Sequence, residues 1–188
     1  MADAKHVSFG LRLPAFVRGD QTDKMEAIVR YVQHAEDLGF ESAFTIDHFV
    51  ITPPAYACTW LEPMVFLTAV ASRTKSIRIG PLVMVLPIRN PMYLAKQTAT
   101  LDFLSGGRFI MGAGVGWNEE EFGLMQVPWS QRGKRTTECL EVLTALWTKN
   151  NVTYKVTLPD KTIKTYRSKT EAKMQVARKG GSWEEVSG

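Results

Sequence analysis

Three short segments of this sequence carry residues suited to ligand chemistry, and each follows an apolar run rich in β-branched residues. They are Asp47-His48-Phe49, residues 82–91 and residues 112–118. A histidine with an ordinary pKa of about 6.5 donates or accepts a proton near neutral pH. Glycines at the end of a strand let the backbone approach a flat ligand closely. These residue types predict a proton-transfer group beside a ligand-binding wall.

The elements that must position these segments alternate along the chain. We predict strands at residues 6–13, 41–46, 77–85 and 108–112, and helices at residues 25–38, 63–72, 91–104 and 131–147. Apolar strands that alternate with amphipathic helices are typical of a parallel sheet covered by helices. Because the carboxyl ends of parallel strands lie at one face, the three segments are expected to meet at a single cleft.

Helical spacing also predicts which side chains face the core. In the first helix these are Met25, Ile28, Val29, Val32, Ala35 and Leu38, and Gly39 supplies the stop. In the last helix they are Leu140, Leu143, Ala145 and Leu146.

Size and composition favour one globular unit. With 188 residues, 45% of them hydrophobic, the chain can bury a substantial core. It has no apolar run of about 18 residues, so we expect no membrane span. The first residues lack an apolar signal-peptide core, so we expect a cytoplasmic protein. Cys58 and Cys139 fit no metal-ligand spacing and are interpreted as reduced packing thiols, with no metal site.

The carboxyl-terminal part differs in charge and pattern. Eight of the 23 Lys and Arg residues, but only four of the 19 Asp and Glu residues, lie from Lys155 onward, so residues 1–154 are neutral overall. We therefore separate residues 1–154 from a basic tail at 155–188. A hairpin is predicted at 152–166, turning at 158–160, and poor order at 170–188. The basic residues have no interleaved aromatic residues, which argues against nucleic-acid binding.

Several motifs, taken in this order and spacing, resemble the luciferase-like family of flavin-dependent enzymes. They are Ala35-Glu36-Asp37-Leu38-Gly39-Phe40, Asp47-His48-Phe49, Arg89-Asn90-Pro91, Ala95-Lys96-Gln97, Leu101-Asp102-Phe103-Leu104-Ser105-Gly106-Gly107-Arg108 and Gly112-Ala113-Gly114-Val115-Gly116-Trp117-Asn118-Glu119. The resemblance covers roughly residues 7–154. It implies a (βα)8 TIM barrel that binds FMN or coenzyme F420, a 5-deazaflavin, and performs oxygenation of a small organic substrate or hydride transfer. The second and fifth motifs favour the F420 branch.

The resemblance also implies roles for individual residues. His48 would be catalytic and face the flavin edge or the substrate, and Asp47 would contact the ring. Alternatively, His48 orients Asp47 or caps a helix. Leu82 and Val83 would form a bulge with a non-proline cis peptide that bends the ring, although the pattern alone reads as strand core.

The remaining cofactor contacts implied by the resemblance come from the ends of the third and fourth strands. Val85 would lie near the flavin, although barrel filling explains it equally well. Gly114, Val115 and Gly116 would let the backbone approach the ring, with a purely steric turn as the alternative. A Rossmann loop fits poorly, because the third glycine spacing is wrong and residues 117–122 do not read as a helix start.

Charged and aromatic residues near the predicted cleft have simpler interpretations. Glu119, Glu120 and Glu121 read as a solvated acidic face, with an acid or base role for one of them as the alternative. Arg89 and Arg108 read as surface or ion-pair residues. Trp60 and Trp117 either wall a substrate pocket or cover the core.

The chain departs from the family in length. A complete barrel needs about 250 residues, whereas the match here ends after about four βα units. The alternative function is therefore a catalytically incomplete half-barrel that serves as a structural or self-associating module, with two copies pairing as a homodimer. The partner expected for the enzyme is a small-molecule substrate.

Overall fold

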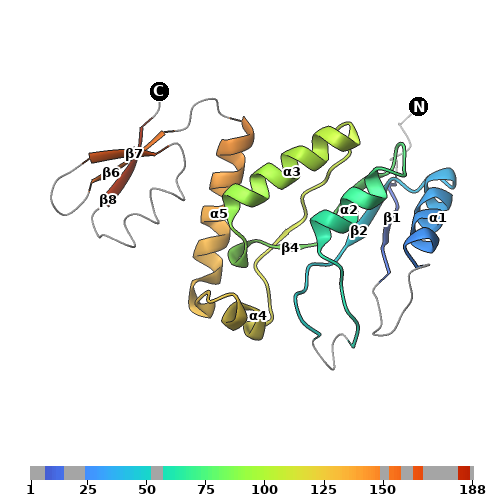
Figure 1. Ribbon diagram of the computed structural model, residues 1–188, viewed down its shortest axis with the longest axis horizontal. Helices are drawn as coiled ribbons and strands as arrows, with labels where there is room; N and C mark the ends of the chain where they lie inside the picture. Colours follow the sequence, from blue (N-terminus) through green and yellow to red (C-terminus); the bar gives the residue numbers. More distant parts are fainter. Residues whose placement is uncertain are drawn as a thin grey trace.

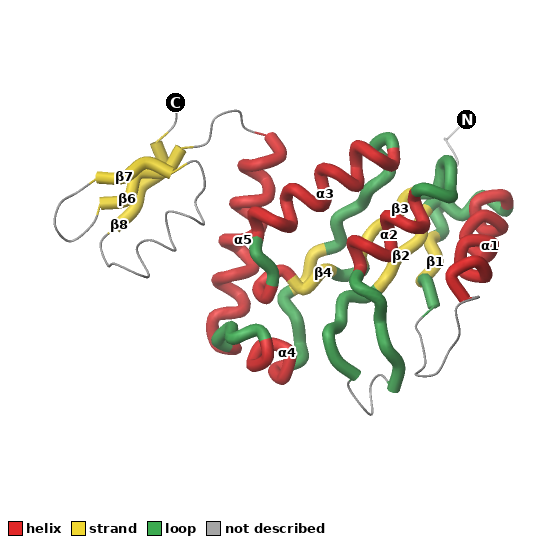
Figure 2. Tube along the Cα trace, viewed as in Figure 1, coloured by secondary structure: helices red, strands yellow, loops and turns green. Residues whose placement is uncertain are grey.

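The computed structural model describes residues 7–14, 24–51 and 57–148, together with the backbone of strands at 153–157, 163–166 and 182–186. Parallel strands occupy the middle of the main body, and helices lie against them (Figure 1). The segment that begins at residue 46, after the second strand, and the segment that leads into the helix at Glu119–Leu124 both run along the lower side of the view in Figure 2. The predicted α/β class with parallel sheets is therefore confirmed.

The strands form two small parallel sheets in the main body. β1 (Gly10–Arg12), β2 (Ser42–Thr45) and β3 (Arg78–Pro81) pair in the order β1-β2-β3, and β4 (Met84–Val85) pairs with β5 (Ala113–Gly114). The helices are α1 (Lys24–Asp37), α2 (Pro63–Ala71), α3 (Pro91–Ser105), α4 (Glu119–Leu124) and α5 (Arg132–Thr148), with 3-10 turns η1 (Leu86–Ile88) and η2 (Trp129–Gln131).

Two predicted strands differ from the observed ones. The strand predicted at 77–85 is divided into β3 and β4, and the strand predicted at 108–112 becomes β5 at 113–114. Residues 108–112 nevertheless run beside β3, because Ile79 N donates to Arg108 O at 2.9 Å and Ile110 N donates to Ile79 O at 2.8 Å. The pairing between residues 79–85 and residues 108–114 is interrupted where the chain bends at residues 82–83. Regular strand pairing between these two segments is therefore confined to β4 and β5.

The helices begin and end where local chemistry favours it. At the start of α2, the Glu62 carboxylate accepts from Val65 N at 2.8 Å, and Pro63 occupies the first turn. At the start of α3, the Asn90 side chain accepts from Met92 N at 2.9 Å. These contacts satisfy amide donors that the helix itself leaves without acceptors.

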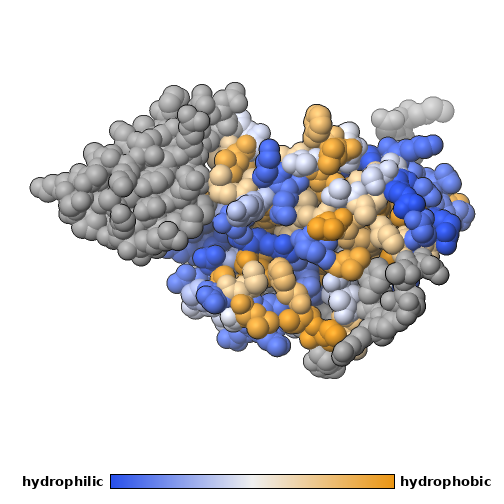
Figure 3. Space-filling model, viewed as in Figure 1, coloured by the Kyte–Doolittle hydropathy of each residue, from blue (hydrophilic) through white to orange (hydrophobic). Residues whose placement is uncertain are grey.

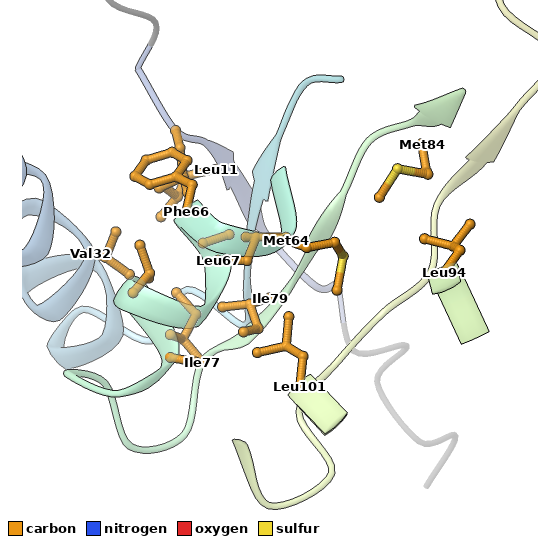
Figure 4. Packing of buried hydrophobic residues seen from close by; sticks show 14 of the residues in the cluster. Leu11, Val32, Met64, Phe66, Leu67, Ile77, Ile79, Met84, Leu94 and Leu101 are labelled. Carbon is orange, nitrogen blue, oxygen red and sulfur yellow. The ribbon is translucent and has the colours of Figure 1, made fainter. Parts of the chain in front are cut away.

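The core lies between the strands and the helices α1, α2, α3 and α5. Strand and helix side chains meet there (Figure 4): Leu11, Val32, Met64, Phe66, Leu67, Ile77, Ile79, Met84, Leu94 and Leu101. The prediction of a core position is wrong for two residues. Leu38 is 65% exposed because α1 ends at Asp37, and Leu140 is 41% exposed because the buried stripe of α5 contains Cys139 and Leu143.

The outer surface of α2 and α3 retains apolar side chains. Figure 3 shows them gathered over these helices, and Val65, Phe103 and Leu104 are among the most exposed large hydrophobic residues. None of the helices that the structure describes is long and apolar enough to span a bilayer.

The carboxyl-terminal strands form a separate antiparallel sheet. β6 (Thr153–Thr157) pairs with β7 (Ile163–Tyr166), as the predicted hairpin requires. β8 (Ser182–Val186) pairs with the other edge of β6 and was not predicted, since residues 170–188 show little apolar pattern. The rest of that stretch lies outside the described residues, and the boundary at residues 154–155 stays a prediction.

Candidate functional site

The three segments predicted to converge do meet, at the carboxyl ends of the strands. They enclose a cavity of about 330 Å³. Its lining contains every predicted site residue: Asp47, His48, Leu82, Val83, Val85, Gly114, Val115 and Gly116. Ile46 and Trp117 complete the lining. The convergence is therefore a property of the fold, whereas the roles assigned to these residues stay predictions.

A non-proline cis peptide joins Leu82 and Val83, as the resemblance implies. Hydrogen bonds fix both sides of this bulge, from Leu82 N to Thr45 O at 2.7 Å and from Met84 N to Gly112 O at 2.8 Å. The Leu82 side chain is 56% exposed, and Val83 is 36% exposed. The bulge thus presents two apolar side chains to the cavity.

The glycines opposite the bulge are required by packing within the protein. A Cβ atom on Gly114 would lie 2.3 Å from Val83 Cγ2. Gly116 has a φ of +78°, and a Cβ atom there would lie 2.7 Å from Val85 Cγ1 and 2.8 Å from Phe122 Cε2. A larger side chain at Gly114 or Gly116 would push these neighbours away. Glycine at both positions therefore allows the loop after β5 to pack closely against residues 83–85.

Asp47 ties the end of β2 to β4. Its carboxylate is 2% exposed, accepts from Val85 N at 2.9 Å and forms an ion pair with the Arg89 guanidinium. Burial raises the pKa of Asp47, and the charge and hydrogen bond of Arg89 oppose that rise. Arg89 also reaches Glu62 at 3.0 Å and lies over the Phe49 ring at 4.8 Å. Arg89 is therefore an ion-pair residue, one of the two interpretations given above.

His48 is held by a carboxylate that arrives from α4. Its Nδ1 lies 3.1 Å from Glu121 Oε1 and 3.2 Å from Oε2, and Phe49 N donates to the same Oε1 at 2.6 Å. The Trp117 ring meets the imidazole edge-on, with ring centroids 5.5 Å apart. The side chains of His48 and Glu121 are 6% and 2% exposed. The imidazole is thus fixed on the side of Nδ1.

The interpretation of residues 119–121 as a solvated acidic face is wrong for Glu121. Glu119 and Glu120 are exposed, but Glu121 is 1% exposed. The statement that residues 117–122 do not start a helix is also wrong, because Asn118 caps α4 and accepts from Glu120 N at 3.2 Å. Asn followed by three glutamates is a helix-start signal that could have revealed this. Phe122 then fixes the buried side of α4, next to Glu121.

The other candidate residues lie around the cavity or away from it. Trp117 lines it, whereas Trp60 is 7% exposed, is absent from the lining and lies under the Arg12 guanidinium at 5.4 Å. Arg108 donates to backbone carbonyls at the ends of α2 and α3. Within the described ranges, no cluster of three or more His, Cys, Asp or Glu side chains could hold a metal ion.

Comparison with known proteins identifies the family. The model of the luciferase-like monooxygenase family matches residues 7–171. A curated relative, the F420-dependent glucose-6-phosphate dehydrogenase of Amycolatopsis mediterranei, is 33% identical over 137 residues, which are 68% of this chain and 39% of that protein. The chain thus spans less than half the length of this relative.

Solved structures agree with this result. The monooxygenase RslO1 from Streptomyces bottropensis superposes with a TM-score of 0.71 at 25% identity, covering 85% of this chain and 47% of that one. The coenzyme F420-dependent tetrahydromethanopterin reductase from Methanopyrus kandleri gives a TM-score of 0.55 at 29% identity, covering 74% and 40%. The chain belongs to the luciferase-like monooxygenase family, and its fold corresponds to part of the barrel of that enzyme family.

Proposed function

We propose that this chain contributes the cofactor-binding and proton-transfer half of an oxidoreductase that uses coenzyme F420 or FMN to act on a small organic substrate. The observation that carries the proposal is the single cavity formed by Asp47-His48, the Leu82–Val83 bulge and the Gly114–Gly116 loop. Residues from three separate βα units converge there, as an active site at the carboxyl face of a barrel requires.

The cavity suits a flat aromatic ring system. Its volume of about 330 Å³ falls at the lower end of the range of about 300–1,000 Å³ for small-molecule sites. Leu82, Val115 and Trp117 are partly exposed and line it, so the walls offer apolar faces. Such faces pack against a planar ring, and the glycine loop adds backbone donors and acceptors at its edge.

Bound F420 or FMN would supply hydride transfer, and FMN would in addition supply oxygen activation. The residues of this chain would place the reactants and move the proton. His48 is the titratable group of the lining that is suited to exchanging a proton near neutral pH. The oxygens of Asp47 already accept hydrogen bonds from Val85 N and the Arg89 guanidinium. Any contact of Asp47 with the cofactor ring would therefore be made in addition to these bonds.

F420 is the preferred cofactor in this proposal. Two relatives of at least 29% identity carry F420 dependence in their names, the dehydrogenase of A. mediterranei and the reductase of M. kandleri. Titration of the purified chain with F420 and with FMN, followed by fluorescence, tests this preference. Tight binding of FMN without any response to F420 would reverse it.

A second candidate function is a half-barrel that associates without catalysis. In the described part of the chain, β1 and β5 lie at the outer ends of their sheets, with one paired side each. Edge strands of this kind invite pairing with another chain. Sedimentation analysis would separate the two functions, because a flavin-free dimer favours association and a flavin-binding species favours the enzyme.

His48→Ala tests the proton-transfer role directly. Since a positioned general acid or base contributes about 10²–10⁴-fold, we expect turnover to fall by a factor in that range while cofactor binding persists. His34→Ala is the matched control, because His34 is an exposed residue on α1. Equal turnover in the two variants would remove His48 from the mechanism.

A further inference from the structure

Glu121 carries a buried carboxylate, although it is not part of the cavity lining. It is 1% exposed and enters from α4, more than 70 positions along the chain from its partners. Burying a charge is costly unless hydrogen bonds compensate for the lost water. The donors that compensate here are the imidazole of His48 and the backbone amide of Phe49.

The Glu121 carboxylate faces two kinds of donor. Oε1 accepts from Phe49 N at 2.6 Å and lies 3.4 Å from Val50 N, and both oxygens lie near His48 Nδ1, Oε1 at 3.1 Å and Oε2 at 3.2 Å. An ionised carboxylate accepts hydrogen bonds and donates none. A neutral imidazole beside it must therefore carry its proton on Nδ1, which leaves the lone pair on Nε2.

We propose that Glu121 is a positioning residue that selects the Nδ1–H tautomer of His48 and thereby leaves the proton-accepting lone pair on Nε2. The proposal rests on the proposed function of His48. The bond from Phe49 N keeps the carboxylate in place, because it fixes Oε1, which also lies 3.1 Å from His48 Nδ1. The Trp117 ring also packs against the imidazole in a T-shaped arrangement.

Glu121→Gln tests this assignment with almost no change in shape. The amide oxygen of glutamine is expected to remain on Phe49 N–H, because that position requires an acceptor. The amide NH₂ group then faces His48 Nδ1 as a donor. The amide oxygen also lies near Nδ1 and competes with this donor, so the variant should lower the fraction of His48 that carries its proton on Nδ1 and raise the fraction protonated on Nε2. Glu120→Gln is the matched control, since it removes the same charge from an exposed neighbour on α4.

The measurement is two-dimensional NMR of the imidazole ¹⁵N nuclei in the full chain at a pH where His48 is neutral. His48→Asn identifies the His48 signals among the three histidines of the chain. We expect protonated Nδ1 in the wild type and in Glu120→Gln, and a larger fraction of His48 protonated on Nε2 in Glu121→Gln. A wild-type His48 with its proton on Nε2, or a folded Glu121→Gln variant with the wild-type proportion of Nδ1–H, would overturn the proposal.

Two further readouts separate the possible failures. Should Glu121→Gln fail to fold, as judged by circular dichroism, the wild-type tautomer alone still decides the proposal. Turnover with the bound cofactor then addresses His48 itself. If His48→Ala leaves turnover unchanged but Glu121→Gln shifts the tautomer as expected, the proposed function fails and the tautomer selection by Glu121 stands. If His48→Ala abolishes turnover but Glu121→Gln leaves the tautomer unchanged, the proposed function stands and the role of Glu121 fails.

Discussion

Arg108 is the side chain whose removal should most clearly reveal how the helices are joined to the strands. Its guanidinium donates to Ser105 O at 2.7 Å, Ala71 O at 2.8 Å, Ile77 O at 2.9 Å, Thr74 Oγ1 at 3.0 Å and Thr74 O at 3.3 Å. Two of these acceptors are the last residues of α2 and α3. A cation there satisfies carbonyls that the helices leave without donors and opposes their negative ends.

The magnitude follows from these bonds. Each hydrogen bond contributes about 1 kcal/mol net, and more when one partner is charged. Methionine in place of arginine keeps part of the packing, and some carbonyls regain water, so we expect Arg108→Met to lower the free energy of unfolding by about 3 kcal/mol. Arg108→Lys should fall between the wild type and methionine, because an ammonium group cannot match the planar set of donors.

Urea denaturation followed by circular dichroism provides the assay. Arg78→Met is the control, since Arg78 lies on β3 with an exposed side chain, and its replacement should change the free energy of unfolding by no more than about 0.5 kcal/mol. If Arg108→Met and Arg78→Met lose equal stability, the bonds to the helix ends contribute nothing measurable and the reasoning fails.

Two further predictions concern the pH dependence of stability and thiol reactivity. Burial raises the pKa of Glu36, but hydrogen bonds from the amides of Ser76, Ile77 and Lys75 outweigh it, so its pKa lies below the ordinary 4.5. The unfolded chain then binds this proton more readily, and the stabilisation present above about pH 4.5 should be lost as the pH falls through the folded pKa. Glu36→Gln should flatten this loss in urea midpoints measured between pH 3.5 and 7, from about one unit below the ordinary value of 4.5 to well above it, and an unchanged slope would contradict the assignment. Burial raises the pKa of the Cys139 thiol to about 11, so a thiol reagent should modify the half-buried Cys58 in the native protein and Cys139 only after unfolding. Disappearance of the rapid reaction in Cys139→Ala rather than in Cys58→Ala would refute this.

Local sequence signals located most of the elements. Pro63 and Pro91 in first turns, Gly39 after α1 and the apolar runs of β2 and β3 were sufficient, because caps and periodicity act over a few residues. The alternation of these elements also predicted a parallel fold and hence the meeting of three distant segments. The resemblance to the family added the cis peptide at Leu82–Val83, which no pattern of hydrophobicity would indicate.

The sequence by itself therefore determined which residues reach the cavity, since strand order and direction follow from local pattern. Only the tertiary structure decided which side chains and backbone groups form hydrogen bonds with these residues. Glu121 belongs to a run of acidic residues that looks solvated, and it becomes the partner of His48 only because α4 folds back over the end of β2. Arg108 likewise gains its acceptors from two helix ends that are unrelated in sequence. Long-range hydrogen bonds depend on where elements pack, and burial makes those bonds strong without leaving a periodic trace in the chain.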